Sequence, residues 1–226
     1  MIEKTEIDVL KRSLDFWERL TPLQRKILTE DARAYSYEAG NALHFGEHDC
    51  IGVLIVISGT LRTYMLSEEG KEVTLYRLNK GDVCVLSASC VLDTITFDVH
   101  IDSETDCRIV QISSKAFSVL ASENIYVEAF THRLATERFS DVMWVMQQIL
   151  FMSFDKRLAA FLIDESSKTG SNRIAMTHDQ IARHMGSARE VVSRMLKYFS
   201  KEGWISLSRG NVEIIGKEQL RSLLSK

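Results

Sequence analysis

Apolar and polar residues follow three different patterns along the 226 residues, and each pattern predicts a different kind of structure. The segment 8–34 has helical spacing, and Thr21 is placed to cap a helix that begins at Pro22. The segment 36–112 contains short runs rich in β-branched residues, separated by six of the eleven glycines. From 123 to 151 there is neither glycine nor proline, which indicates a long helix.

The glycine-punctuated segment predicts an antiparallel β domain. Its clearest apolar runs are 52–57, 61–66 and 73–78. The turn 67–71 contains Gly70, which can adopt the positive φ that a tight hairpin requires. Many short strands separated by turn signals are typical of a jelly roll or a barrel. We therefore expect residues 1–112 to form an N-terminal helix and a jelly-roll domain.

The helix predicted for 123–151 carries two apolar rows. One row recurs every three or four residues, as in a coiled coil, and consists of Ala135, Phe139, Val142, Met146 and Ile149. The other row includes Phe130 and Leu134. A helix that is apolar on two sides must bury one side on its own domain, and a second copy of the chain would cover the other. The pattern leaves open burial within a monomer as the alternative.

Two capping boxes mark a pair of short helices within residues 153–226. Thr177 and Gln180 form a T-x-x-Q box that opens the first helix, and Gly186 ends it. Directly afterwards, an S-x-x-E box beginning at Ser187 predicts the second helix. Two helices joined by so tight a turn are typical of a helix-turn-helix.

The second of these helices, which extends to about Lys201, is apolar on one side and basic on the other. Its apolar face consists of Val192, Leu196 and Phe199, and its polar face carries Arg189, Ser193, Arg194 and Lys197. The run 203–215 then alternates about a Gly-Asn turn, which predicts a β-hairpin. A helix-turn-helix followed by such a hairpin is a winged helix, a module that binds DNA.

The distribution of charge agrees with a nucleic-acid partner. Residues 153–226 contain 13 Lys and Arg against 8 Asp and Glu, a net charge of +5, whereas residues 1–152 contain 15 against 23, a net charge of −8. A basic module attached to an acidic body suggests that the module binds a polyanion.

The C-terminal module resembles the signature of the CRP/FNR family of bacterial transcription regulators. The matching residues are Thr177, Gln180, Ile181, Ala182, Met185, Gly186, Ser187, Arg189, Glu190, Val192, Ser193, Arg194, Leu196, Gly203 and Ile205. The β segment that ends in Gly81-Asp82 looks like that family's sensor jelly roll, and the helix 123–151 falls where the family keeps its dimerisation helix. The resemblance therefore covers essentially the whole chain.

This resemblance implies an α+β protein built from three parts. They are a jelly-roll sensor domain in residues 1–112, a connecting and dimerisation helix in 113–152 and a winged helix-turn-helix domain in 153–226. It also implies a homodimeric transcription regulator that is not an enzyme, binds a two-fold symmetric operator in double-stranded DNA and contacts RNA polymerase.

The family pattern assigns base contacts to four residues at the start of the recognition helix: Arg189, Glu190, Ser193 and Arg194. Arginine can pair with guanine through two hydrogen bonds, and glutamate can accept one from cytosine N4. The alternative for Glu190 is a purely capping role. The combination is mixed, because Arg189-Glu190 resembles the CRP branch and Glu190-x-x-Ser193-Arg194 resembles the FNR branch. Phosphate contacts are expected from Thr177, His178, Lys197, Lys201 and Arg209.

Two effectors known in the family do not fit the sequence. No arginine or lysine occurs between Lys80 and Arg108, where the family's cyclic-nucleotide pocket carries an arginine that holds the phosphate. We therefore do not expect cAMP. No cysteine precedes Cys50, so the N-terminal cysteine cluster of the FNR branch is absent and we do not expect an iron–sulfur cluster.

The candidate effector pocket lies where the family places its own. Its residues are Gly81, Asp82, Cys84, Ser87, Ser89 and Cys90. Cys84 and Cys90 could form a redox switch or bind a soft metal or haem. The alternative is that both thiols are small buried apolar side chains. Residues 87–89 could instead open a short helix that binds an anion.

Other classes of protein fit the sequence less well. The longest stretch without a charged residue, 142–154, is shorter than the about 17–25 residues that span a membrane. The four cysteines form no CxxC pair, so we expect reduced thiols and a cytoplasmic protein without a zinc ribbon. A cupin-like metal-dependent enzyme is the alternative function, because a jelly roll can carry a metal site. It would need a close His-x-His, whereas the segment offers only His44, His48 and an isolated His100.

Overall fold

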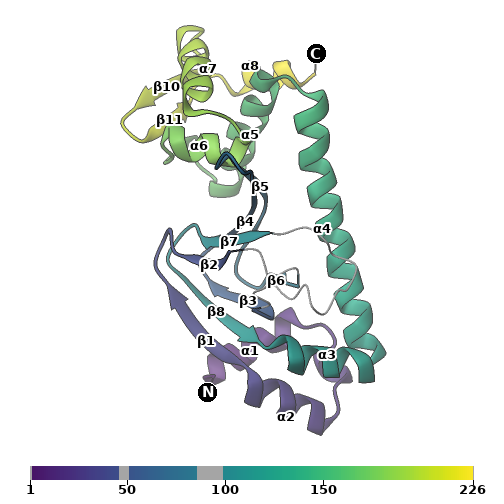
Figure 1. Ribbon diagram of the computed structural model, residues 1–226. Coiled ribbons are helices and arrows are strands. Elements are labelled where there is room, and N and C mark those ends of the chain that lie inside the picture. The colour runs from purple at the N-terminus through teal and green to yellow at the C-terminus, as the bar shows by residue number, and fades with distance from the viewer. Residues whose placement is uncertain (1, 46–50, 86–98, 226) are drawn as a thin grey trace. The chain divides into compact units, whose positions relative to one another are not determined.

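The computed structural model describes residues 2–45, 51–85 and 99–225 (Figure 1). The described residues form two compact units, one made of 1–65 with 75–142 and the other of 66–74 with 143–226. Both contain helices, and every strand pair with a defined register is antiparallel. The predicted α+β class is confirmed.

The first unit begins with helices that the sequence predicts locally. They are α1 (Lys4–Ser13), the short 3-10 helix η1 (Trp17–Arg19) and α2 (Pro22–Asp31). The backbone N–H of Gln24 donates to the Thr21 hydroxyl over 3.2 Å, and the Thr21 N–H donates back to the Gln24 side chain over 3.1 Å. This reciprocal capping box satisfies backbone groups that would otherwise lack partners, so α2 begins at Pro22 as predicted.

Two four-stranded sheets form the β part of this unit. One has the order β1 (Arg33–Tyr37), β8 (Cys107–Ile112), β3 (Val53–Ser58) and β6 (Val83–Cys84), and the other has the order β2 (Ala42–Phe45), β7 (His100–Ser103), β4 (Leu61–Leu66) and β5 (Glu72–Leu78). Strands β4 and β5 are joined by the predicted turn, in which Gly70 has φ +77°. This is the jelly roll that the glycine pattern predicts.

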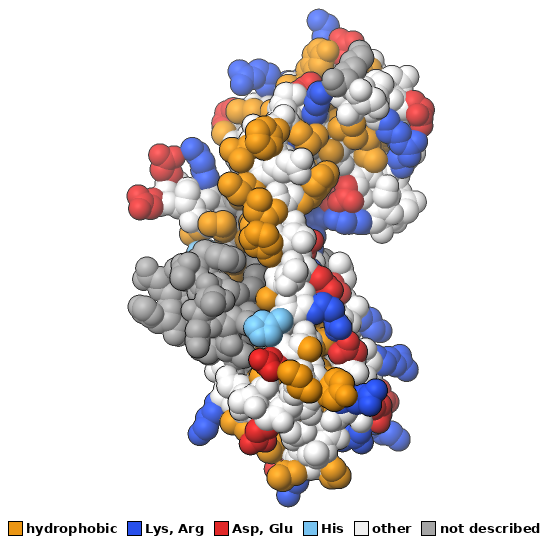
Figure 2. All heavy atoms as spheres, turned by 90° about the vertical axis from the view of Figure 1, so that its right-hand side faces the viewer, with side chains coloured by type: hydrophobic (Ala, Val, Ile, Leu, Met, Phe, Trp, Pro, Cys, Tyr) orange, Lys and Arg blue, Asp and Glu red, His pale blue; other side chains and the backbone are white. Residues whose placement is uncertain are grey.

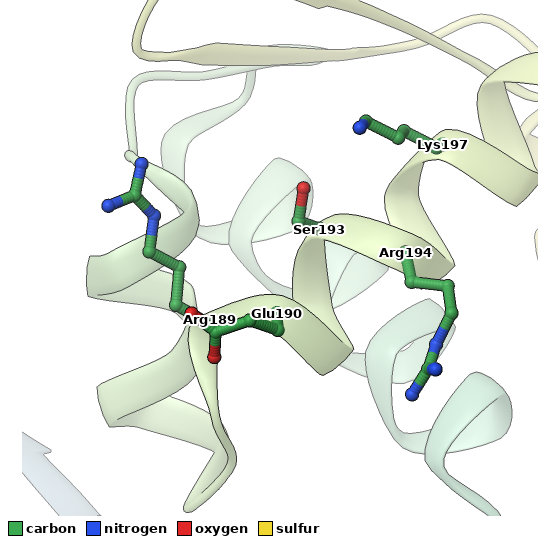
Figure 3. A pocket seen from close by; sticks show the side chains of 5 residues that line it. All are labelled: Arg189, Glu190, Ser193, Arg194 and Lys197. Carbon is green, nitrogen blue, oxygen red and sulfur yellow. The ribbon is translucent and has the colours of Figure 1, made fainter.

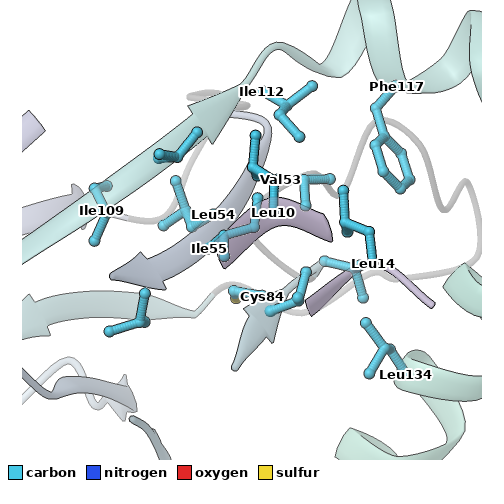
Figure 4. Close-up of a cluster of buried hydrophobic side chains, with 14 of the residues drawn as sticks. Leu10, Leu14, Val53, Leu54, Ile55, Cys84, Ile109, Ile112, Phe117 and Leu134 are labelled. Carbon is cyan, nitrogen blue, oxygen red and sulfur yellow. The ribbon is translucent and has the colours of Figure 1, made fainter. Parts of the chain in front are cut away.

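The core of the first unit lies where helices cover the β-structure. Leu10 of α1, Leu14 directly after it, Ile55 of β3 and Phe117 of α3 (Ser114–Glu123) are fully buried there (Figure 4). Cys84 is 1% exposed and lies among these apolar side chains. Burial of this apolar surface is the main favourable contribution to folding of the unit.

The long helix α4 (Ile125–Phe151) begins two residues later than the glycine-free segment suggests. Asn124 separates it from α3: its backbone is extended, with φ −137°, and its side chain accepts the N–H of Tyr126 over 3.0 Å. Asparagine favours this capping position over a helix interior, because its side chain satisfies a free backbone donor. Of the two predicted apolar rows, the one with Phe130 and Leu134 is buried against the core of its own domain.

The second unit contains the predicted winged helix-turn-helix. Its elements are α5 (Phe154–Thr169), β9 (Arg173–Ile174), α6 (His178–Met185), α7 (Arg189–Lys201), β10 (Ile205–Ser208), β11 (Asn211–Ile214) and α8 (Lys217–Leu224). Val192, Leu196 and Phe199 of α7 are fully buried, as their spacing predicts. The wing is a three-stranded sheet with the order β10, β11, β9.

The turn between α6 and α7 differs in one detail from the sequence prediction. Thr177 and Gln180 form the expected capping box, and Gly186 ends α6 with φ +61°. The second predicted box is wrong: the N-cap of α7 is Ala188, and no side chain caps it. The reason lies in the helix end before it, because the Ser187 N–H donates to the Ala182 carbonyl and so belongs to the last turn of α6.

The wing turn is also shifted by one residue. Ser208 pairs with Asn211, so the loop is Arg209-Gly210 rather than Gly-Asn. Gly210 takes the positive φ, +71°, that a two-residue hairpin loop requires. This places Arg209 at the tip of the wing.

No helix among the described residues is long and apolar enough to cross a membrane.

Candidate DNA-binding surface

The exposed face of α7 carries a row of polar side chains that line an open groove. The lining residues are Arg189, Glu190, Ser193, Arg194 and Lys197 (Figure 3). Ser193 is half-buried and the other four are exposed. Burial of Val192, Leu196 and Phe199 on the opposite side orients α7 so that its polar side faces solvent.

The charged groups of this groove make no hydrogen bond or ion pair with any described residue. Elsewhere in the same unit, basic side chains are paired: Lys168 with Asp164 at 2.7 Å and Arg221 with Glu218 at 2.5 Å. The groove therefore presents three positive charges and one negative charge that no internal partner neutralises. An uncompensated basic surface of this kind attracts polyanions.

Glu190 is not needed to cap its helix. Ala188 is the N-cap and no side chain caps the helix, so the structure does not give Glu190 the purely capping role that was its alternative. The Glu190 carboxylate lies in the first turn of α7, exposed beside Arg189 and one turn before Arg194. The structure thus brings together all four residues that the sequence assigns to base contacts.

The residues predicted to contact phosphate lie in three elements. Thr177 caps α6, and its hydroxyl and backbone N–H are both engaged with Gln180. Lys197 and Lys201 are exposed on α7, and Arg209 is exposed at the wing tip. Partial burial lowers the pKa of His178, and the positive charges of Arg189 and Lys197 lower it further. His178 therefore lies within electrostatic reach of the groove.

A second surface runs along α4 (Figure 2). Of the predicted seam, Phe139, Met146 and Ile149 are exposed, whereas Ala135 and Val142 are partly buried against the N-terminal core. The sequence prediction missed further exposed apolar side chains on the same helix: Met143, Trp144, Leu150 and Phe151. The seven-residue spacing of 143 with 150 and of 144 with 151 is the signal that could have found them. Exposed apolar side chains that gather on one helix mark an interaction surface.

Comparisons with known proteins agree with this geometry. A model of the Crp-like helix-turn-helix domain matches residues 156–223, and one of the cyclic nucleotide-binding domain matches residues 35–124. A solved structure of a transcriptional regulator of the crp/fnr family from Eubacterium rectale is 41% identical, with 96% of this chain and 100% of that chain covered and a TM-score of 0.91. The chain belongs to the CRP/FNR family.

Two further relatives of the chain are transcription regulators by name. The transcriptional activator protein anr of Pseudomonas aeruginosa is 26% identical over 79% of this chain and 75% of its own. The cAMP-activated global transcriptional regulator CRP of Haemophilus influenzae is 23% identical over 95% of this chain and 98% of its own. This chain is thus a transcription regulator with a helix-turn-helix DNA-binding domain. Its relatives are regulators rather than enzymes.

Three of the predicted effector residues of this CRP/FNR regulator, Gly81, Asp82 and Cys84, lie among the described residues. Gly81 and Asp82 make a tight turn, in which the Asp82 carboxylate accepts the N–H of Asn79 over 2.7 Å. Cys84 lies in the core, as the alternative interpretation of the thiols has it. Ser87, Ser89 and Cys90 lie outside the described residues.

Two of the three histidines weighed for a metal site lie on the paired strands β2 and β7. His44 lies in β2 and is buried, His100 lies in β7 and stacks on Tyr64, and His48 lies outside the described residues. No group of three or more His, Cys, Asp or Glu side chains in the described part of the chain is arranged to hold a metal ion.

Proposed function

We propose that this regulator binds a two-fold symmetric operator in double-stranded DNA as a homodimer, with the start of α7 of each subunit in the major groove. The observation that carries the proposal is the groove face of α7, where Arg189, Glu190, Arg194 and Lys197 are exposed and have no partner among the described residues. In a helix-turn-helix protein, the first turns of the second helix contact the base edges.

The side chains suggest how the bases are read. Arg189 or Arg194 can form two hydrogen bonds with guanine O6 and N7, and Glu190 can accept a hydrogen bond from the N4 group of cytosine. Because Glu190 and Arg194 lie one turn apart, they can contact the two bases of one G·C pair. Ser193, between them, can reach several base edges. We therefore expect a guanine in each half of the operator.

Phosphate contacts position the helix without reading sequence. Lys197, Lys201 and Arg209 are the proposed contacts, since each is exposed and basic. His178 and Thr177 are proposed at the start of α6, where a helix N-terminus favours an anion. The Thr177 hydroxyl already accepts the capping hydrogen bond from the Gln180 N–H. Thr177 would therefore contribute by fixing the N-terminus of α6, which faces the anion.

The proposed dimer uses the apolar face of α4. Phe139, Met146 and Leu150 lie on one side of the helix, at spacings of seven and four residues, and are between 49% and 63% exposed. Exposure of apolar side chains to water is unfavourable, and a second copy of the same helix would bury them. In such a dimer the two recognition helices must lie about one DNA turn, roughly 34 Å, apart to enter successive major grooves. A non-cAMP effector or a thiol redox signal in the jelly-roll domain would control this spacing through α4. Contact with RNA polymerase and a cytoplasmic location follow from the family.

Selection of binding sites from random duplex DNA tests the proposal directly. Purified protein would be used in parallel under reducing and oxidising conditions. A palindromic motif with a guanine in each half-site is the expected result, and a motif in only one arm would favour thiol control. A motif without two-fold symmetry would overturn the dimeric operator. If the protein is a dimer in solution but enriches no sequence in either arm, the proposal that the effector-free protein binds an operator is overturned.

A further inference from the structure

A second row of side chains runs along α7 beside the groove. It consists of Val191, Arg194, Tyr198 and Lys201, whose spacings of three, four and three residues place them on one side of the helix. Arg194 borders both the groove and this row. Tyr198 lies one turn after Arg194 and one turn before Lys201. The row therefore holds an aromatic ring between two basic side chains.

The Tyr198 ring is half-exposed, yet other rings hold it in place. It is 47% exposed, and its centre lies 5.9 Å from that of the Trp204 ring, with an angle of 78° between the two planes. The buried Phe199 ring lies 5.3 Å from Trp204 on the inner side. Aromatic rings at these distances attract one another, most of all when edge meets face. The Tyr198 side chain is therefore partly fixed before any partner binds.

The backbone of Trp204 fastens this ring cluster to both α7 and the wing. Its N–H donates to the Phe199 carbonyl over 3.0 Å, at the end of α7. Its carbonyl accepts the N–H groups of Ile215 and Gly216 over 2.9 and 2.8 Å, directly after β11. A side chain that is held in this way loses less conformational entropy on binding, so Tyr198 is suited to contact a partner.

The chemistry around the Tyr198 hydroxyl indicates what kind of partner fits. The hydroxyl makes no hydrogen bond with any described residue, and it can donate one. Arg194 and Lys201 are exposed, and neither forms an ion pair in the part of the chain that the structure describes. A donor between two positive charges matches an anion, and the ring beside it matches an uncharged surface such as a sugar. The backbone of DNA presents both, because each phosphate is bonded to a deoxyribose.

We propose that Tyr198 binds the sugar–phosphate backbone of DNA beside the bases that α7 contacts. Its hydroxyl donates a hydrogen bond to a phosphate oxygen, and its ring packs against the adjoining deoxyribose. Arg194 and Lys201 supply the positive potential that attracts the phosphate. Glu202, the exposed acidic residue after Lys201, marks the edge of this surface. The inference rests on the proposed function and adds a residue that the family resemblance does not assign.

Tyr198→Phe tests the hydrogen bond, because it removes only the hydroxyl and keeps the ring contact with Trp204. It is expected to unfold in urea as the wild type does and to weaken DNA binding about 3- to 10-fold for each half-site, the range for one hydrogen bond. Operator and random duplex should lose affinity by similar factors, since a phosphate contact carries no sequence information. Tyr35→Phe is the control, because Tyr35 of β1 is 43% exposed and lies in the other unit.

The dependence on salt distinguishes this contact from that of a lysine. The hydroxyl carries no charge, so its loss should leave the salt dependence of binding unchanged, whereas Lys197→Ala should reduce it. Neutral methylphosphonate groups placed singly along the operator then locate the phosphate. At one position in each half-site, the substitution is expected to weaken binding by the wild type more than binding by Tyr198→Phe. Equal effects on both proteins at every position would overturn the contact.

The outcomes separate this inference from the proposed operator. Wild-type affinity in Tyr198→Phe would overturn the contact and leave the operator proposal standing. Binding to random duplex that depends on Tyr198, without any selected motif, would confirm the contact and overturn the operator. Failure of the wild type to bind either DNA would overturn both.

Discussion

Glu190 and Arg194 lie one helical turn apart on α7 and carry opposite charges, yet their side chains form no ion pair. Such a pair would stabilise an exposed helix by only about 0.2–0.5 kcal/mol. Two hydrogen bonds from an arginine to guanine contribute about 1–3 kcal/mol of discrimination. Both side chains are therefore free to contact DNA, where their contribution to the binding free energy would exceed the stabilisation from pairing with each other.

Arg194→Ala is expected to abolish sequence-specific binding. Each subunit would lose a base contact of about 1–3 kcal/mol, and a dimer loses it twice. Affinity for the selected operator, measured by fluorescence anisotropy at fixed salt concentration, checks this. Arg221→Ala is the matched control, because Arg221 is an exposed arginine of the same unit that is paired with Glu218. Wild-type affinity in the Arg194 variant would contradict the assignment of α7 as the recognition helix.

Lys197→Ala is expected to act differently from Arg194→Ala. A phosphate contact carries no sequence information, so binding to operator and to random DNA should weaken by similar factors. The plot of the logarithm of the association constant against the logarithm of the salt concentration has a negative slope. That slope should become less negative by about 1 for each lost contact. A change in sequence preference without a change in slope would show that Lys197 contacts bases instead.

Phe139→Glu is expected to produce a monomer with a folded DNA-binding domain. The substitution places a charge in the apolar α4 surface, where a second copy would have to bury it at high cost. Analytical ultracentrifugation checks the oligomeric state, and circular dichroism checks the fold. Leu23→Glu is the control, since Leu23 is an exposed apolar residue of α2. A Phe139 variant that remains dimeric would place the interface elsewhere.

Thr177→Ala and Ser187→Ala are expected to differ in stability. Thr177 caps α6 through its side chain, and loss of such a cap costs about 1 kcal/mol. Ser187 precedes the uncapped start of α7 and has no such bond. Urea unfolding of both variants checks the contrast. Equal destabilisation would mean that Ser187 caps α7 after all.

The stability of the protein is expected to fall when the pH drops through the range in which histidine titrates. The pKa of His178 is lower in the folded protein than its ordinary value of 6.5, so the unfolded chain binds more protons in that range. The contribution of His178 is therefore present above pH 6.5 and is lost as the pH falls through the folded pKa. Urea unfolding at pH 7.5 and 5.5 should show a smaller loss for His178→Gln than for the wild type.

Local features of the structure could be predicted from the sequence because few residues decide them. Thr21 with Gln24 and Thr177 with Gln180 determine helix starts within a span of four residues, and Gly186 ends a helix because its φ is positive. The polar face of α7 follows from a repeat of three to four residues. The sequence by itself therefore determined the fold class, the winged helix and the members of the candidate DNA-binding face.

Only the tertiary structure decided which side chains have partners and which are buried. Ala135 and Phe139 have the same spacing pattern, but packing of the core covers the first in part and leaves the second exposed. The position of Cys84 in the core and the contact of Arg138 with Tyr76 join residues far apart in the chain. Burial and long-range contacts depend on how strands and helices pack together, and no local pattern encodes that arrangement.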